Sequence, residues 1–319
     1  MSIPILLHPE MSGGWISHSA CRQLESEGTT AYRIYTSSTA WIDRYGPYYV
    51  ISSTQEREAL QLLEVLKNRA SESPYEAVFF RRLVIGAKRE NTPVLLDGRE
   101  PNERVCVLEN RLKFWVDFQV GYSTGLFCDQ RKNRFFLAEK VRGLGASSLL
   151  NCFSYTCAFS VAAAQANPEL RTTNLDLSAK FLNWGKENYI LNELTKGEQN
   201  KHRFWRCDVM RRLPRLCREG SKFDIIILDP PTFSRGEKGR VFRVADDFEE
   251  LADRAVQCAS EQGWILLSTN HSALSSDDLK SIGAAAALKN GRKYSFHYEA
   301  PPDEYDGAAA ASVWMQLEV

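Results

Sequence analysis

The sequence predicts an α/β fold in which a doubly wound, mostly parallel sheet follows a smaller α+β domain. From residue 146 onward, short apolar runs alternate with helical stretches, a pattern typical of β-α units that build a parallel sheet. The last two extended segments have no helix between them, which indicates an antiparallel hairpin at the sheet edge. We therefore expect a small domain over residues 1–128, which could bind substrate, and a larger domain over residues 129–319.

The larger domain is expected to contain seven strands. The clearest is Phe223 to Leu228, because it is rich in β-branched residues and bounded by turn residues. Ser178 is expected to cap the helix that carries Leu182 and Tyr189. The expected strands cover residues 147–151, 172–175, 203–207, 223–228, 263–269, 293–299 and 312–318, and further helices cover residues 160–166, 247–261 and 276–288.

The smaller domain gives weaker signals. Strands within residues 31–53 are expected to surround a turn at Gly46 and Pro47, and an amphipathic helix follows over residues 56–68. A second strand pair is expected within residues 105–118, around a turn at Asn110.

The composition is that of a soluble globular protein, with 44% hydrophobic and 25% charged residues among 319. No apolar run reaches the length of a membrane span, and the first ten residues lack the basic and apolar segments of a signal peptide. Lysine plus arginine and aspartate plus glutamate both number 40. This balance argues against a nucleic-acid-binding surface over the whole molecule but allows a local basic patch.

The eight cysteines are scattered along the chain. None forms a Cys-x-x-Cys pair, and no Cys/His cluster has the spacing of zinc ligands, so no metal site is expected. Buried, reduced thiols in a cytoplasmic protein are the simplest interpretation. The sequence leaves the oligomeric state open.

Four segments follow strands of the predicted sheet, at the edge where ligands bind in open α/β sheets. The loop from Asn151 to Thr156 could hold a carboxylate on its backbone N–H groups beside a helix start. The Asp176 carboxylate could accept hydrogen bonds from both hydroxyls of a ribose. The Asp208 carboxylate and the Val209 backbone N–H could form hydrogen bonds with an adenine ring. The fourth segment is Asp229-Pro230-Pro231-Thr232-Phe233.

Each of these segments also has a plain structural interpretation. An aspartate after a strand is often a helix cap or a turn residue, which applies to Asp176 and more strongly to Asp208. The occurrence of both in order, each after a strand, favours ligand binding. Asp229 and its prolines could simply end a strand. Together with Phe233, however, Asp229 and the two prolines would form a rigid wall of the pocket. A base could stack on this wall, and its backbone carbonyl groups could accept hydrogen bonds from an amine.

A basic stretch separates the third and fourth predicted strands. Most such stretches are solvated helix faces, although beside an aromatic wall this one could contact phosphates. The basic loop over residues 234–243 could close over a substrate or merely connect two elements. The residues of the basic stretch are His202, Arg203, Arg206, Arg211, Arg212, Arg215, Arg218 and Lys222.

Three motifs in order resemble the large-subunit ribosomal RNA methyltransferases. The subgroup is that of the cytosine-C5 enzymes with an RNA-binding PUA domain and the related guanine-N7 enzymes. The likeness extends from about Ala31 to the C-terminus. Upstream, residues 41–46 and 121–127 are similar to the family's Val-Asp-Arg-Tyr-Gly and Gly-Gln-Lys-Thr-Gly-Phe-Phe segments. The three motifs are Asp-Gln-Arg-Lys-Asn-Arg over residues 129–134, Asn-Cys-Phe-Ser-Tyr-Thr over 151–156 and Asp-Pro-Pro-Thr-Phe-Ser over 229–234.

This resemblance implies a Rossmann-like class I methyltransferase fold with a seven-stranded sheet that binds S-adenosylmethionine (SAM). It implies that residues 153–155 lie along the methionine part of SAM, that Asp176 holds the ribose and that Asp208 holds the adenine. Asp229 would face the methyl group and the target atom. The full set of expected cofactor contacts is Gln130, Arg131, Phe153, Ser154, Tyr155, Thr156, Asp176, Leu177, Asp208, Val209 and Asp229.

The sequence departs from the family pattern at four places. Cys157 stands where the family usually has glycine, so a positive φ there would strain the loop and weaken cofactor binding. Ser123 replaces a lysine, and the residues before Ala31 are too few for a PUA domain, so none is expected. His271 stands where the cytosine-C5 members carry the cysteine whose thiolate adds to carbon 6 of the pyrimidine.

The missing thiolate favours a base nitrogen as acceptor, because nitrogen already holds a lone pair and needs only positioning and, where it carries a hydrogen, deprotonation. We therefore expect methylation of ribosomal RNA. Methylation of a small molecule or a protein, or a binding module that has lost turnover, remain alternatives, and His271 could simply line the pocket. The expected catalytic residues are Asp229, Pro230, Thr232, Phe233 and His271.

Overall fold

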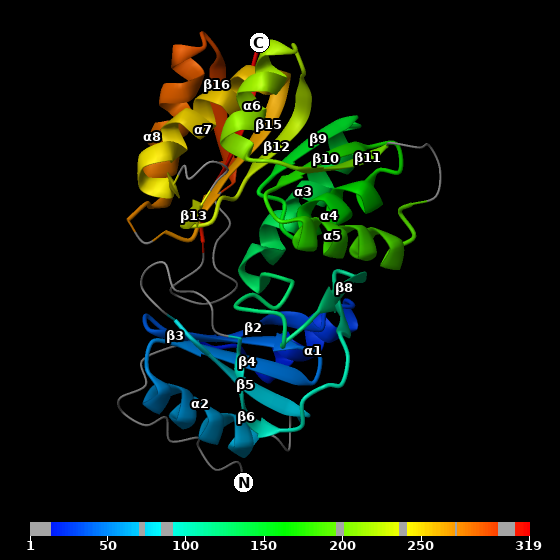
Figure 1. The fold of residues 1–319 in the computed structure, drawn as a ribbon, viewed down its shortest axis with the longest axis vertical. Coiled ribbons are helices and arrows are strands. Elements are labelled where there is room, and N and C mark those ends of the chain that lie inside the picture. The colour runs from blue at the N-terminus through cyan, green and yellow to red at the C-terminus, as the bar shows by residue number, and fades with distance from the viewer. Residues whose placement is uncertain are drawn as a thin grey trace. The chain divides into compact units, whose positions relative to one another are not determined.

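The computed structural model describes residues 14–69, 74–83, 92–195, 201–235, 241–271, 273–298 and 310–319. They form two compact units, one up to Asp129 and the other from Gln130 onward (Figure 1). Within these ranges, no helix is both long enough and apolar enough to cross a membrane. The first ten residues, where we expect no signal peptide, lie outside the described ranges.

The first unit is built on a six-stranded sheet with the strand order β1-β2-β3-β4-β5-β6. Strands β4 and β5 pair in parallel, and the predicted helix between them, α2 (Glu56–Arg69), buries Leu62, Leu63 and Leu66 in the core. The other elements are β1 (Gly14–Trp15), α1 (His18–Ser26), β2 (Ala31–Thr36), β3 (Ala40–Tyr45), β4 (Tyr48–Ser53), β5 (Ala77–Arg82) and β6 (Val94–Gly98).

The predicted strand pair around Asn110 is a separate hairpin of β7 (Val105–Glu109) and β8 (Leu112–Val116). Asn110 and Arg111 both have positive φ, 50° and 67°, as a two-residue type I′ turn requires. The Arg111 N–H donates to the Gly28 carbonyl at 2.9 Å, which ties the hairpin to the segment before β2.

The second unit is built on the seven-stranded sheet that the sequence predicts, in the order β11-β10-β9-β12-β15-β17-β16. The first five strands in that order run parallel, whereas β17 is antiparallel to both of its neighbours. The predicted hairpin of β16 and β17 therefore closes one edge. The strands are β9 (Ser148–Cys152), β10 (Arg171–Asp176), β11 (His202–Arg206), β12 (Phe223–Leu228), β15 (Ala259–Thr269), β16 (Lys293–Tyr298) and β17 (Ala311–Glu318).

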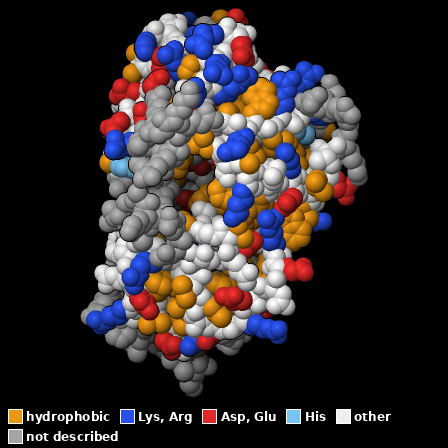
Figure 2. All heavy atoms as spheres, viewed as in Figure 1, with side chains coloured by type: hydrophobic (Ala, Val, Ile, Leu, Met, Phe, Trp, Pro, Cys, Tyr) orange, Lys and Arg blue, Asp and Glu red, His pale blue; other side chains and the backbone are white. Residues whose placement is uncertain are grey.

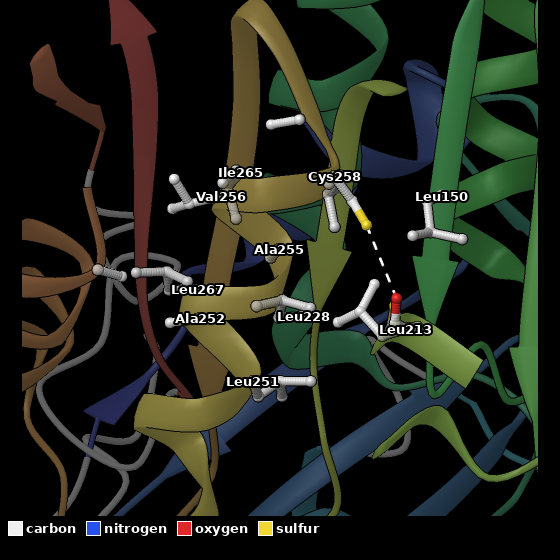
Figure 3. Packing of buried hydrophobic residues seen from close by; sticks show 14 of the residues in the cluster. Leu150, Leu213, Leu228, Leu251, Ala252, Ala255, Val256, Cys258, Ile265 and Leu267 are labelled. Atoms are coloured by element: carbon white, nitrogen blue, oxygen red, sulfur yellow. Dashed lines mark hydrogen bonds between the residues drawn. The ribbon is translucent and has the colours of Figure 1, made fainter. Parts of the chain in front are cut away.

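Helices cover both faces of this sheet (Figure 1). Because neighbouring strand residues point to opposite faces, Leu149 packs with α3 and α4, whereas Leu150 packs with α6 and α7. Figure 3 shows the second of these layers, where the Cys258 thiol donates to the Leu213 carbonyl at 3.8 Å. The helices are η1 (Cys128–Gln130), α3 (Arg131–Leu144), α4 (Ala158–Ala166), α5 (Ala179–Leu191), α6 (Val209–Arg218), α7 (Val244–Cys258) and α8 (Ser276–Lys289).

The strand order reverses between β9 and β12. From β9 the chain runs outward through β10 to β11, then returns to β12 and continues to β15 on the other side. The last residues of the two central strands, Cys152 and Leu228, are directly paired. Ligands of open α/β sheets bind beyond the carboxyl ends of the strands at such a reversal.

One helix and the strand after it, expected over residues 263–269, differ from the predicted bounds. The helix expected over residues 247–261 begins at Val244 and ends at Cys258, and Ala259 already belongs to β15. Ala259 pairs with Phe223 at the start of β12, so strand pairing ends the helix earlier than the sequence pattern indicated. The basic loop begins and ends in an antiparallel pair, β13 (Phe233–Arg235) and β14 (Val241–Arg243), and its residues 236–240 lie outside the described ranges.

Removal of a buried ion pair should destabilise the first unit. Arg33 and Asp43 face each other across β2 and β3, with Nε 2.8 Å from Oδ1 and side chains only 9% and 5% exposed. We expect Asp43→Ala to lower the free energy of unfolding by about 3 kcal/mol, because it leaves the guanidinium buried without its carboxylate. Arg82→Ala, which breaks an exposed pair with Glu56 at 3.2 Å, should cost less than about 1 kcal/mol. Urea unfolding measures both, and equal losses would contradict this expectation.

Candidate active site

The four predicted segments lie at one edge of the seven-stranded sheet. The neighbouring strands β9, β10 and β12 end at Cys152, Asp176 and Leu228. Asp208 follows β11, which pairs with β10 on its outer side. Because these strands run parallel, the residues that follow them converge beyond the same edge, at the reversal of strand order.

The loop after β9 has an unusual backbone. Phe153, Tyr155 and Cys157 have φ values of 57°, 48° and 62°, in the left-handed region that residues with a Cβ rarely adopt. Each such residue costs on the order of 1–2 kcal/mol, so other contacts must hold the loop in this form. Because left-handed residues alternate with others, the loop turns sharply beyond the end of β9 and runs beside the end of β10.

The contacts that hold this loop come from β10 and α5. The Ser154 N–H donates to the Leu175 carbonyl at 2.9 Å, and the Tyr155 N–H donates to Oδ2 of Asp176 at 2.9 Å. The Asn188 amide donates to the Thr156 carbonyl at 3.0 Å. The strained loop is therefore tied to two elements that are themselves buried in the second unit.

Cys157 has the positive φ that its place in the family pattern predicts, and its side chain is buried. The thiol lies against Gly185 of α5, where an added Cβ would be only 2.4 Å from the Cys157 Sγ. Burial raises the pKa of the Cys157 thiol well above its ordinary value. The cysteine is thus accommodated by a glycine on the facing helix, and burial favours its neutral thiol form.

Asp176 links the loop to the next helix. Its Oδ2 accepts from Tyr155 and its Oδ1 accepts from the Ser178 N–H at 2.8 Å. Burial raises the pKa of the Asp176 carboxyl, while the two backbone hydrogen bonds act in the opposite sense. Both oxygens keep further lone pairs, so the carboxylate can still accept from paired hydroxyls. The adjacent Leu177 carbonyl accepts from Nε of Arg206 at 3.3 Å.

Asp208 fits both interpretations that the sequence left open. It is the N-cap of α6, with Oδ1 accepting from the Met210 N–H at 2.9 Å, and Val209 is the buried first residue of that helix. Its Oδ2 is also buried, and the described residues provide it with no hydrogen-bond donor. A buried carboxylate oxygen without a donor is costly, so a ligand group or an ordered water that donates to Oδ2 would stabilise it.

Asp229 follows β12 and is held by a side chain from the start of α3. Gln130 donates through Nε2 to Oδ1 of Asp229 at 3.2 Å and to Oγ of Ser268 at 2.8 Å. Gln130 is buried and occupies both amide hydrogens in these two bonds. Arg131, the other expected contact in this motif, is the first residue of α3 and is partly buried.

The residues after Asp229 form a restrained turn. Pro230 is buried, and the Thr232 hydroxyl donates to Oδ1 of Asn270 at 2.8 Å, which joins the end of β12 to the end of β15. The backbone of Phe233 starts β13, but its side chain lies outside what the structure describes.

His271 closes its own turn after β15. Its Nδ1 accepts from the Ala273 N–H at 3.1 Å, and its own N–H donates to the Thr269 hydroxyl at 3.1 Å. With Nδ1 acting as an acceptor, a neutral imidazole carries its proton on Nε2. His271 therefore has a structural partner on one ring nitrogen and can offer a donor on the other.

The basic stretch lies on β11 and on the outer side of α6. Figure 2 shows Lys and Arg side chains gathered over the part of the second unit where α6 lies. Arg203 and Arg212 lie over the Trp205 ring, with Cζ 5.8 and 4.5 Å from its centroid. His202 carries no charge near neutral pH, contrary to its place in the predicted basic stretch, because burial and Lys201 lower its pKa to about 4.

The chain is similar to known methyltransferases. A family model for S-adenosylmethionine-dependent methyltransferases matches residues 38–317. Ribosomal RNA large subunit methyltransferase I of Shewanella denitrificans is 31% identical over 284 residues, which cover 86% of this chain and 69% of that protein. YwbD of Bacillus subtilis, assigned as a ribosomal RNA large subunit methyltransferase, is 28% identical over 88% of this chain and 70% of its own length.

Solved structures agree in fold. A protein assigned as a methyltransferase and solved in complex with S-adenosylhomocysteine (SAH) is 26% identical, with a TM-score of 0.79 over 94% of this chain and 79% of that one. A Streptococcus mutans protein assigned as a SAM-dependent methyltransferase is 25% identical, with a TM-score of 0.77 over 94% and 78%. The fold is thus that of a class I methyltransferase. The chain belongs to the S-adenosylmethionine-dependent methyltransferases, and SAM is its cofactor.

Several residues that shape the site escaped the sequence analysis. Asn133 lies inside a motif that resembles the family, but nothing in the motif indicates that it contacts Gln130. Ser268 and Gly185 carry no signal, because their importance comes from residues far away in the sequence. Within the described ranges no group of three His, Cys, Asp or Glu side chains could hold a metal ion.

Cys157 and Gly185 should be energetically coupled. Gly185→Ala places a Cβ against the Cys157 thiol, and we expect it to lower the free energy of unfolding by about 1–3 kcal/mol. In a Cys157→Gly background the same change should cost much less, because the thiol is gone. Urea unfolding of the two single variants, the double variant and the parent gives the coupling. Additive losses would show that the contact does not matter.

Proposed function

We propose that this enzyme methylates a base nitrogen in ribosomal RNA, in the cytoplasm, with Asp229 facing the acceptor. The observation that carries the proposal is the Asp229 carboxylate, held by Gln130 where the strand order reverses. Ribosomal RNA as the substrate is supported by the names of the relatives, which are ribosomal RNA large subunit methyltransferases.

The cofactor would be bound by the residues at the sheet edge. Residues 153–155, in the loop that β10 and α5 hold in its left-handed form, would lie along the methionine part of the cofactor, and Thr156 would lie beside them. Asp176 would accept from the ribose hydroxyls, with Leu177 beside it. The buried Oδ2 of Asp208 would accept from the adenine amine, with Val209 alongside. When bound, SAM supplies an electrophilic methyl group on a sulfonium cation.

The described site favours nitrogen over carbon 5 as the acceptor. Addition to carbon 6 of a pyrimidine needs a thiolate, but Cys152 and Cys157 are buried and burial raises the pKa of both thiols. A nitrogen acceptor attacks the methyl carbon through its own lone pair as the S–C bond breaks and SAH leaves, and a proton has to be accepted only where that nitrogen carries a hydrogen. The carboxylate of Asp229 can accept that proton, and the Nε2–H of His271 could donate to another atom of the base.

The residues around Asp229 would hold the base in place. Pro230 restricts the backbone, and Thr232 is fixed by its hydrogen bond to Asn270. Phe233 remains our candidate for stacking on the base. Accurate placement of two reacting groups contributes a large part of the rate of such bimolecular reactions.

The basic face of α6 would contact RNA phosphates. Residues 201–222 hold eight Lys or Arg and only two Asp or Glu, although the whole chain has no net charge. Arg215 and Arg218 are exposed and lie on the side of α6 opposite to the buried Leu213 and Leu216. The zero net charge of the chain instead favours the second candidate, a small molecule or a protein as acceptor.

Loss of the Asp229 carboxylate should abolish transfer without removing the cofactor. We expect Asp229→Asn to lower the rate of methyl transfer to RNA by about a hundredfold or more, because the acceptor proton loses its base. Binding of SAH, measured by calorimetry, should change less than about threefold, because the proposed contacts of the loop after β9, Asp176 and Asp208 remain and the asparagine keeps a side-chain oxygen at position 229.

The control is Asp277→Asn, an exposed carboxylate on α8. Mass spectrometry of nucleosides from ribosomal RNA of a deletion strain identifies the base. An unchanged nucleoside profile would count against ribosomal RNA as the substrate, and a fully active Asp229→Asn enzyme would exclude Asp229 as the base.

RNA binding should depend on salt through α6. The double variant Arg215→Gln/Arg218→Gln should weaken binding to deproteinised ribosomal RNA and reduce the slope of log K against log salt by about 2, roughly 1 per lost phosphate contact. Arg142→Gln/Lys293→Gln removes two exposed charges elsewhere on the second unit and should leave the slope unchanged. Gel shifts at several salt concentrations measure it. A slope near zero in the parent protein would favour a small-molecule or protein acceptor.

A further inference from the structure

A buried chain of hydrogen bonds leads from β17 to Asp229. The Trp314 indole N–H donates to Oδ1 of Asn133 at 3.1 Å. The Asn133 amide donates to Oε1 of Gln130 at 2.8 Å and to the Ser312 hydroxyl at 3.1 Å. Gln130 then donates to Asp229 at 3.2 Å. Trp314, Asn133 and Gln130 are at most 3% exposed.

The direction of this chain is set at its far end. An indole N–H can only donate, so the atom of Asn133 that faces Trp314 must be the carbonyl oxygen. Asn133 therefore presents its amide hydrogens to Gln130, whose carbonyl oxygen accepts. The amide hydrogens of Gln130 are then left for Asp229. A reversed Gln130 would place its carbonyl oxygen against the carboxylate and leave Asn133 without an acceptor in a buried place.

We propose that Trp314 and Asn133 are positioning residues for Asp229, acting through Gln130. The proposal rests on the proposed role of Asp229 facing the methyl group and the acceptor. This chain of hydrogen bonds from Trp314 through Asn133 and Gln130, hereafter the relay, keeps an N–H donor on Oδ1 of Asp229. That donor stabilises the ionised carboxylate and restricts the plane of the carboxyl group. The orientation of the reacting group thus depends on an indole that touches neither cofactor nor substrate.

A purely structural role would not require this network of hydrogen bonds. An apolar core of the same volume would support the sheet, whereas buried amides are tolerated only when all their hydrogen bonds are made. In this network both amides use all their N–H groups, and Ser268 and Ser312 accept the second hydrogen of each. Complete pairing in one direction leaves a single arrangement for Gln130.

The sharpest test is Asn133→Asp. The new carboxylate still accepts from Trp314 but can no longer donate, so Gln130 must turn its N–H groups toward position 133 and its carbonyl oxygen toward Asp229. The probes are SAH and sinefungin, an analogue of SAM that carries an amine in place of the transferable methyl group. The ratio of their dissociation constants, measured by calorimetry, reports whether Asp229 faces that amine, and no acceptor is needed.

We expect the preference of the parent for sinefungin over SAH to fall by about tenfold in Asn133→Asp, with SAH affinity changed less than about threefold. Trp314→Phe removes the indole donor and keeps an aromatic ring, so it should reduce the ratio in the same sense. Trp264→Phe is the matched control, since that indole N–H is also buried but finds no acceptor among the described residues. It should leave the ratio unchanged.

Double variants distinguish an effect that passes through Gln130 from a general destabilisation of the second unit. In Gln130→Ala the link to Asp229 is gone, so adding Trp314→Phe should produce no further fall in the ratio. An unchanged ratio in Asn133→Asp, or an equal loss of affinity for both ligands, would overturn the proposal. A normal ribosomal RNA profile in the deletion strain with a reduced ratio in Asn133→Asp would reject the RNA substrate and keep the relay.

Discussion

The pairing of β9 with β12 is the constraint on which the rest of the second unit depends. The two strands are consecutive in the sheet but separated by two others in the chain, so the strand order reverses between them. Because Cys152 pairs with Leu228, the loop after β9 and the turn after β12 begin side by side. The same pairing lets β10 present Asp176 next to that loop. The loop after β9, Asp176 and Asp229 are brought together by this register, whereas Asp208 also depends on the pairing of β10 with β11.

Backbone strain and buried hydrogen bonds are concentrated at the same edge. Three residues of one loop adopt left-handed conformations, and the loop is held by Asp176 and by the amide of Asn188. Beyond the end of β12, Gln130 donates to Asp229. Such backbone strain is tolerated where the surrounding structure over-determines it, as β10 and α5 do for this loop. In this way the stability of the sheet supports a site that would not form alone.

Much of the second unit could be predicted from the sequence, since periodicity and turn residues indicate all seven strands, the final hairpin and the cap at Ser178. The end of α7 could not, because it is set by the pairing of Ala259 with β12 rather than by local pattern. The family's glycine only raised the question of a positive φ at Cys157, and the accommodation of the cysteine by Gly185 depends on packing between distant segments. The network behind Asp229 was missed for the same reason: its members come from four elements and share no spacing.

The place of β17 in the sheet has a consequence for synthesis of the protein. This strand is made after all the others of the sheet, yet it lies between β15 and β16 and carries both Ser312 and Trp314. The parallel strands and the loop after β9 are therefore synthesised before the residues that orient Gln130. Under the proposed relay, Gln130 acquires its single orientation only when β17 pairs with β15. A chain that lacks β17 would keep the residues proposed to bind the methyl donor and would lose the residues proposed to orient the carboxylate of Asp229.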